Sequence, residues 1–162
     1  MEKKPIPVTI CAIVSRKKIL LIKRNDGHYK GLWAIPGGKI EHGEHLSGAA
    51  IREIKEEIGI DSKFQDLIGI VSEHLIENNE IIEHFLLNFC TVKPDTIKIE
   101  SAPIGEVKWF SLKKLLNHKQ DIIESDYEMI NRMLINKEGT YYNCVMKKEN
   151  DSYILEKFDL LS

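Results

Sequence analysis

The chain has 162 residues, of which 43% are hydrophobic and 30% are charged, and its formal net charge at pH 7 is −2. This balance is typical of one globular domain, and such a chain has no overall positive field that would attract nucleic acid or anionic lipid. The sequence contains no apolar run of about 20 residues that could span a membrane, and its first ten residues lack the pattern of a signal peptide.

The three cysteines, Cys11, Cys90 and Cys144, lie far apart and show no CxxC spacing. A sparse, odd set of cysteines fits reduced thiols better than a disulfide framework, and it offers no cluster for structural zinc. We therefore expect a cytoplasmic protein.

Five segments are predicted to be strands because they are rich in apolar and β-branched residues and are bounded by polar turns. They are residues 8–14, 19–24, 64–76, 81–92 and 107–110. The second segment is expected to pair with the first across residues 15–18, and the fourth with the third across residues 77–80. Pro36 disfavours helix at Ile35, so residues 32–38 are expected to be extended.

Three segments are predicted to be helices. Residues 46–58 have helical periodicity, and Gly59 follows them as a C-terminal stop. Residues 111–118 begin with Ser111, whose hydroxyl could cap a helix, and residues 121–135 form a second amphipathic segment.

Residues 140–161 are predicted to form a β-hairpin with its turn near residues 149–152. Strands and helices are mixed along the chain, with a hairpin on each side of the main helix. This order predicts an α/β fold in which a mixed β-sheet is covered by helices, plus the C-terminal hairpin.

Three glutamates, Glu53, Glu56 and Glu57, share one face of the helix 46–58 when it is drawn at about 100° per residue. Negative charges this close together repel one another, although each neighbouring pair reduces helix stability by only about 0.2–0.5 kcal/mol. Taken alone, residues 52–57 are therefore more typical of a solvated, charged helix face than of a site.

A second face of the same helix is predicted to be buried, because it carries three isoleucines, Ile51, Ile54 and Ile58. Ala49 and Ala50 lie one turn before the glutamates on nearly the same side. Their small size is expected to leave the carboxylates open to a ligand.

The complete pattern around these glutamates resembles the Nudix box, Gly-x5-Glu-x7-Arg-Glu-U-x-Glu-Glu-x-Gly-U, where U is a bulky aliphatic residue. The chain matches every position, with Gly38, Glu44, Arg52, Glu53, Ile54, Glu56, Glu57, Gly59 and Ile60. The segments LWAIPGGKIE and VKWFSLKKL also look like Nudix flanks. The resemblance implies a Nudix-type α/β/α sandwich over residues 1–138, with residues 139–162 as a C-terminal hairpin extension of the same domain.

Nudix enzymes hydrolyse a diphosphate linkage in a nucleoside diphosphate joined to another group. The resemblance implies that Glu53, Glu56 and Glu57 are metal ligands, with the Gly37 backbone carbonyl as a further ligand. Mg²⁺ is the implied cation, with Mn²⁺ as an alternative, because hard divalent cations prefer oxygen ligands. One of these glutamates, or one from elsewhere, would take the proton from the attacking water.

Four other residues are candidates for supporting roles. By resemblance, Arg52 would orient a glutamate through a charge-assisted hydrogen bond, and Glu44 would support a metal through water or hold the loop. Arg24 and Lys39 are candidates for binding phosphate. The alternative for both is an exposed, solvated side chain.

A glutamate outside the box could supply an extra ligand or base, and the sequence does not choose among Glu83, Glu100 and Glu106. If the hairpin turns between Asn78 and Asn79, Glu73 faces His84 and His74 faces Glu83. Such opposite charges across strands are ordinary sheet stabilisation.

Two marks of Nudix sub-families are absent. ADP-ribose hydrolases often carry a proline after the box, and dinucleoside-polyphosphate hydrolases a tyrosine slightly further on. The chain has no proline between Pro36 and Pro94 and no tyrosine between Tyr29 and Tyr127. The resemblance therefore favours a MutT-like nucleoside triphosphate pyrophosphohydrolase, with an ADP-ribose or nucleotide-sugar pyrophosphatase as the alternative. A non-catalytic, nucleotide-sensing Nudix domain is the alternative of another class.

The expected partner is a small nucleotide substrate, since the near-neutral charge argues against a nucleic-acid track. An isolated two-stranded hairpin is marginal in water, so residues 139–162 must pack on something. Nudix proteins are often homodimers, and we favour a dimer element over a hairpin packed on its own domain.

Overall fold

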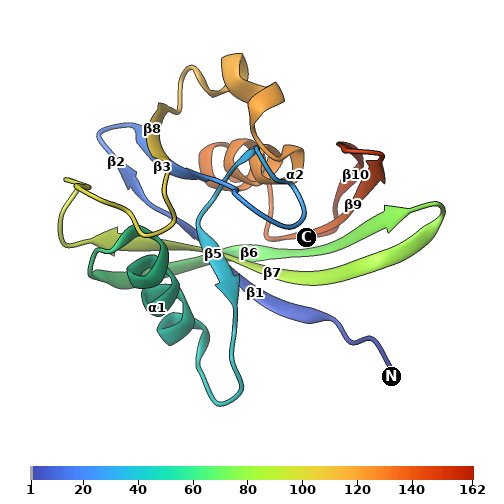
Figure 1. Cartoon of the computed structure of the whole chain (residues 1–162), viewed down its shortest axis with the longest axis horizontal. Helices are drawn as coiled ribbons and strands as arrows, with labels where there is room; N and C mark the ends of the chain where they lie inside the picture. Colours follow the sequence, from blue (N-terminus) through green and yellow to red (C-terminus); the bar gives the residue numbers. More distant parts are fainter. Residues whose placement is uncertain (1) are drawn as a thin grey trace.

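The computed structural model describes residues 2–162 and contains two β-sheets (Figure 1). The larger sheet has six strands in the order β10-β9-β6-β7-β1-β5. Its strands are β1 (Ile6–Ala12), β5 (Gly37–Lys39), β6 (Ser62–Glu77), β7 (Glu80–Pro94), β9 (Tyr141–Glu149) and β10 (Ser152–Leu160). β1 runs parallel to β7 and β6 parallel to β9, whereas the other pairs are antiparallel, so the sheet is mixed as predicted.

The smaller sheet is built around β3, which pairs with each of its other three strands. Its strands are β2 (Val14–Ser15), β3 (Lys18–Lys23), β4 (Trp33–Ala34) and β8 (Val107–Ser111). The predicted pairing of residues 8–14 with residues 19–24 is therefore wrong except at Val14, which pairs with Ile19. β1 instead pairs with β7 along one edge and with β5 along the other, and most of its residues are buried.

Helix α1 (Leu46–Ile58) has the predicted bounds, and Gly59 ends it with a φ of 84°. The expectation for its faces is partly wrong. Ala49 and Ala50 are fully buried, whereas Ile51 is 37% exposed. The alanines let the helix approach β1 closely: the Cys11 sulfur lies 4.0 Å from the carbonyl oxygen of Ala50. Small residues therefore serve helix–sheet packing here rather than access to the glutamates.

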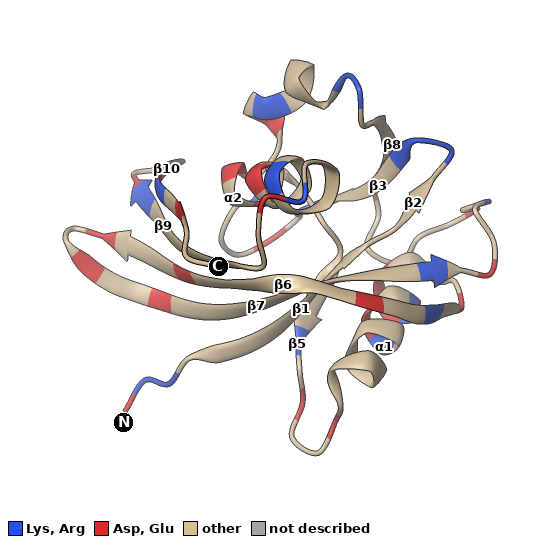
Figure 2. Ribbon diagram, turned by 180° about the vertical axis from the view of Figure 1, so that it is seen from behind, with Lys and Arg blue, Asp and Glu red and all other residues tan. Residues whose placement is uncertain are grey.

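The other helical segments differ from the predicted ones in type. Ser111 ends β8 instead of capping a helix, and a 3₁₀ helix spans Leu115–Asp121. Helix α2 (Glu124–Glu128) continues as a π-helical segment (Met129–Ile135). Figures 1 and 2 show α1 and α2 on opposite faces of the larger sheet, so the predicted α/β sandwich with a mixed sheet is confirmed.

The β6–β7 hairpin turns at Asn78 and Asn79, as predicted, but its register differs. The register shifts after the pair Leu75–Glu83, and His74 therefore faces His84 while Glu73 faces Phe85. The expected glutamate–histidine pairs do not form because this bulge moves each partner by one residue.

The C-terminal hairpin extends the larger sheet of its own chain, since β9 pairs with β6 in parallel register (Figure 1). Its buried side chains are Tyr142, Cys144, Met146 and Phe158. A bulge between Leu155 and Lys157 breaks the expected alternation along β10, so that Phe158 turns inward. The hairpin therefore packs on its own domain, and a homodimer stays a prediction.

Candidate functional site

Strand β5 brings the glycine pair Gly37–Gly38 between β1 and helix α1. A Cβ atom on Gly37 would collide with the Thr9 carbonyl, and one on Gly38 would collide with the Glu53 carboxylate. Only glycine therefore permits the close approach of residue 37 to the Thr9 backbone, whereas a side chain at residue 38 would displace the Glu53 carboxylate.

Arg52 binds three carboxylates at once. Its Nε donates to Glu44 Oε2 at 2.7 Å, and its Nη1 donates to Glu53 Oε1 at 2.8 Å and to Glu56 Oε2 at 3.2 Å. Its Nη2 donates to the Lys39 carbonyl at 3.0 Å and so fixes the loop that enters α1. The hydrogen bonds from Arg52 hold the pKa of Glu44 down at about 2, so Glu44 stays ionised.

Glu57 turns away from Arg52 toward the glycine pair. Its Oε1 accepts a hydrogen bond from the Gly37 N–H at 2.9 Å. Burial raises the pKa of Glu57 to about 7, and the negative charge of Glu53 adds to this effect. Burial also raises the pKa of Glu53, against the lowering effect of Arg52. A cation beside Glu53 and Glu57 would favour their ionised forms, against the effect of burial.

The carboxylates fit a hard divalent cation by chemistry, because their donors are all oxygens. Within residues 2–162, however, no three acidic, histidine or cysteine side chains converge as a ready cluster. Glu56 is turned toward Arg52, and its side chain is 59% exposed.

A cavity of about 410 Å³ lies beside Gly37 and Gly38, within the size range of small-molecule sites. Its walls come from both sheets and are mostly apolar, including Ile6, Val8, Ile10, Ile22, Ala34, Phe85 and Leu87. Arg24 and Lys39 line the cavity with the glycine pair, and the Arg24 Nε donates to the His28 carbonyl at 3.1 Å. The structure thus brings both candidate phosphate-binding residues close to the box.

Among the three candidate glutamates outside the box, only Glu83 lines this cavity. Its Oε1 lies 3.9 Å from His28 Nε2. Glu100 and Glu106 line a different hollow, and the Glu106 carboxylate lies 3.8 Å from the Lys23 ammonium.

Two buried acids that the sequence reasoning missed as site residues also line the cavity. Glu73 is 3% exposed and Asp126 is 6% exposed, and both line the cavity. Asp126 Oδ2 accepts a hydrogen bond from the Ile35 N–H at 2.9 Å. No local signal distinguishes these acids, since Glu73 occurs in a strand with alternating polar residues and Asp126 in an amphipathic helix.

We expect Asp126→Asn to remove part of the pH dependence of stability. Burial, with the charge of Glu73, raises the pKa of Asp126 from 3.8 to about 7. The folded state therefore keeps a proton that the unfolded chain releases, and the free energy of unfolding falls as pH rises from 3.8 to about 7. Asparagine cannot ionise, so the variant should gain stability over the parent above this window.

Urea unfolding at about pH 5 and about pH 8 would measure this difference, and exposed Asp66 offers Asp66→Asn as a matched control. The control should follow the parent at both pH values. A variant whose stability relative to the parent is the same at both pH values would contradict the predicted role of Asp126.

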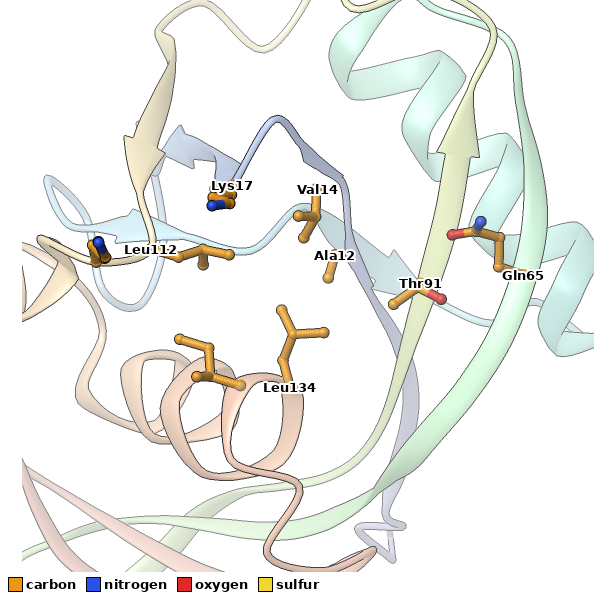
Figure 3. Close-up of a pocket in the computed structure, with 9 residues that line it drawn as sticks. Ala12, Val14, Lys17, Gln65, Thr91, Leu112 and Leu134 are labelled. Carbon is orange, nitrogen blue, oxygen red and sulfur yellow. The ribbon is translucent and has the colours of Figure 1, made fainter.

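A second hollow, of about 440 Å³, shares no lining residue with this cavity (Figure 3). Ala12, Val14, Leu112 and Leu134 point into it, and Lys17 lies at the β2–β3 turn beside it. It holds no candidate site residue.

Basic and acidic segments are interspersed along the strands, loops and α1 (Figure 2). No helix among residues 2–162 combines the length and apolar character needed to cross a bilayer.

Comparison with known proteins gives the NUDIX domain as the matching family, over residues 4–133. "Nudix hydrolase 6" of Arabidopsis thaliana is 31% identical over 105 residues, which cover 62% of this chain and 36% of the relative. "ADP-ribose pyrophosphatase" of Methanocaldococcus jannaschii is 46% identical over 66 residues, which cover 40% of this chain and 39% of the relative. The chain thus spans less than half the length of these curated relatives.

Among solved structures, a MutT NUDIX hydrolase from Burkholderia pseudomallei is 26% identical, with a TM-score of 0.61. The similarity covers 80% of this chain and 98% of that one. The mixed α/β fold agrees with this match. The family model spans most of the chain, and the chain belongs to the NUDIX domain family.

Proposed function

We propose that this protein hydrolyses a diphosphate linkage in a nucleoside diphosphate derivative, with the help of a divalent cation. The observation that carries this proposal is the placement of Glu53 and Glu57 against the glycine pair, which itself lines the 410 Å³ cavity. A ligand whose phosphates lie at the glycine pair would thus place them near these carboxylates. The names of the relatives as hydrolases support the same reaction class.

Glu53, Glu56, Glu57 and the Gly37 carbonyl are the residues that would hold Mg²⁺ or Mn²⁺. When bound, such an ion neutralises phosphate charge, polarises phosphorus and acidifies a water molecule. The carboxylate oxygens suit this hard cation. Its positive charge would lower the pKa of Glu57, so that this carboxyl group is ionised at neutral pH.

The chain's own residues would position the substrate. Arg52 donates hydrogen bonds to Glu53 and to the Lys39 carbonyl. These bonds occupy its guanidinium, so Arg52 would position these groups rather than bind phosphate. Arg24 and Lys39 line the cavity near the glycine pair and would bind phosphate oxygens. Glu44 would hold the loop through Arg52.

Two groups could accept the proton of the attacking water. The Oε1 of Glu57 is engaged by Gly37, which leaves its Oε2 free. Glu83 is the second candidate, because it lines the cavity and is only paired with His28 at 3.9 Å.

We propose a nucleoside triphosphate as the substrate class. An ADP-ribose or nucleotide-sugar substrate is the second candidate, because the M. jannaschii relative is named an ADP-ribose pyrophosphatase. The cavity volume of about 410 Å³ accommodates a nucleoside in either case.

A nucleotide panel tests the function. The purified chain is incubated with nucleoside triphosphates, ADP-ribose and nucleotide sugars, with Mg²⁺ or with excess EDTA, and products are separated by ion-exchange chromatography. Pyrophosphate and a nucleoside monophosphate, formed only with Mg²⁺, are the expected products. AMP and ribose phosphate from ADP-ribose would favour the second candidate. Binding without any hydrolysis would contradict the enzyme and support a nucleotide sensor.

A further inference from the structure

We call the 440 Å³ hollow of Figure 3 the second hollow. Its walls come from the end of β1 and from β2, from the residues that follow β8, from the π-helical segment and from the paired strands β6 and β7. The volume is within the size range of small-molecule sites. Neither the box nor the candidate phosphate-binding residues line this hollow, so the proposed hydrolysis does not use it.

The interior of the second hollow is apolar. Ala12, Val14, Leu112 and Leu134 point into it (Figure 3), and Ile135 also lines it. Val14 and Ile135 are each 40% exposed, so part of this apolar surface is open to water. Covering concave apolar surface with the apolar part of a ligand is favourable.

The rim of the second hollow is positively charged. Lys17 from the β2–β3 turn and Lys113 from the segment after β8 line it, and both side chains are exposed. Within residues 2–162, neither lysine forms an ion pair with an acidic side chain. In that part of the chain no acidic residue lines the hollow either. The hollow thus combines an apolar interior with two cations that an anion could bind.

Three departures from regular backbone geometry meet at the second hollow. Lys17 has a φ of 62°, which residues other than glycine and asparagine seldom adopt. The register shift after Phe64 leaves Gln65 without a strand partner, and Gln65 lines the hollow. The π-helical segment ends at Ile135. Bulges and π-helical turns are over-represented at functional sites, which supports a ligand site here.

We propose that the second hollow binds an acyl carboxylate, a small molecule with an alkyl chain and one carboxylate head. The alkyl chain lies on the apolar interior, and the ammonium groups of Lys17 and Lys113 hold the carboxylate at the rim. This inference does not rest on the proposed hydrolysis, because no residue of the nucleotide cavity takes part in it.

The lining residues favour a carboxylate over a phosphate. Phosphate sites commonly use the planar fork of arginine or the backbone N–H groups of a glycine-rich loop. Among residues 2–162, no arginine and no glycine lines the second hollow.

The direction of the apolar side chains favours one inserted chain over a membrane surface. A protein that lies on a bilayer presents its apolar side chains outward, so that they enter the lipid. The side chains of Val14, Leu112 and Leu134 instead converge on the inside of the hollow (Figure 3).

Isothermal titration calorimetry with octanoate, octanol and butyrate tests the proposal on the full chain at low ionic strength. Octanoate should bind about threefold tighter or more than octanol, which has no charge for the two lysines. It should bind about tenfold tighter or more than butyrate, which lacks four methylene groups of apolar surface. No binding of octanoate at millimolar concentration, or equal affinities for octanoate and octanol, would overturn the proposal.

The position of bound octanoate must be mapped, because the nucleotide cavity also has apolar walls. In ¹H–¹⁵N NMR spectra, octanoate should shift the amide signals of Val14, Lys17, Leu112 and Leu134. Shifts confined to residues of the nucleotide cavity, such as Ile22 and Phe85, would show that the second hollow is not the site.

The double variant Lys17→Gln/Lys113→Gln should weaken octanoate binding about threefold or more, to the affinity of octanol. The melting temperature should not change, because both side chains are exposed. Lys63→Gln/Lys93→Gln is the matched control, since these exposed lysines pair across β6 and β7 and do not line the hollow. Parental affinity in the first variant, or an equal loss in the control, would contradict the proposal.

Val14→Trp should abolish octanoate binding, because an indole ring at this partly exposed position would fill the hollow. The double lysine variant decides the question if this variant is unstable. Vesicles of phosphatidylglycerol test the membrane alternative by co-sedimentation. Vesicle binding that is lost in Lys17→Gln/Lys113→Gln, together with no binding of octanoate, would overturn the proposal in favour of a membrane surface.

Discussion

Glu57→Gln is expected to lower kcat at least about a hundredfold while the fold is retained, because a neutral amide holds a divalent cation poorly. The amide oxygen can still accept the Gly37 N–H, so the backbone contact survives. Stability should not suffer. Burial raises the pKa of Glu57 from 4.5 to about 7, so ionisation of the folded carboxyl reduces stability as pH rises through this window. The variant should unfold at a temperature equal to or above that of the parent at about pH 8.

Steady-state kinetics on the substrate identified by the nucleotide panel, together with circular dichroism melting, would measure both effects. Asp61→Asn is a matched control, since Asp61 follows the same helix and forms only an exposed pair with Lys55 at 3.2 Å. This control removes one carboxylate charge near α1 and should keep parental kcat. Undiminished activity of Glu57→Gln, or of the parent protein in excess EDTA, would contradict the proposed metal-dependent mechanism.

Arg52→Lys is expected to lower kcat/KM about tenfold to a hundredfold, despite the retained positive charge. The guanidinium of Arg52 reaches Glu44, Glu53, Glu56 and the Lys39 carbonyl through three different nitrogens. A lysine ammonium carries its N–H donors on one nitrogen, so it cannot bond the three carboxylates and the carbonyl in the directions that the guanidinium uses. Glu53 should lose its fixed orientation, and the loop entering α1 should lose its anchor.

The pKa of Glu44 provides a readout that is independent of activity. Hydrogen bonds from Arg52 hold this pKa at about 2, and in Arg52→Lys it should rise toward 4.5. A carboxyl ¹³C NMR titration would follow it. Arg132→Lys is the control, because Arg132 also bridges a carboxylate and a carbonyl, those of Glu138 and Phe158, away from the box. Full activity in Arg52→Lys with an unchanged Glu44 titration would contradict the positioning role.

The sequence by itself determined helix α1, the turn of the β6–β7 hairpin and the family. Helix α1 begins and ends where its periodicity and Gly59 predict, because helices form from contacts three and four residues apart. The turn at Asn78–Asn79 was also predictable, since asparagine tolerates the positive φ values found there. The box could be recognised because its charged residues and glycines lie within 23 consecutive residues, 38–60.

Only the tertiary structure decided what lies across from the box. The β6–β7 pairing has three register shifts, and the one between Leu75 and Ile76 sets which residue faces Glu73; nothing within that strand fixes where these shifts occur. Asp126 and Tyr29 line the same cavity as Glu73, although they lie 53 and 44 residues from it in the sequence (126 minus 73 and 73 minus 29). Such neighbours depend on how sheets and helices pack after long loops close, a property that no local window of sequence contains. The docking of the C-terminal hairpin on β6 was likewise open in the sequence, because the apolar face of a hairpin fits its own sheet or a partner's equally well.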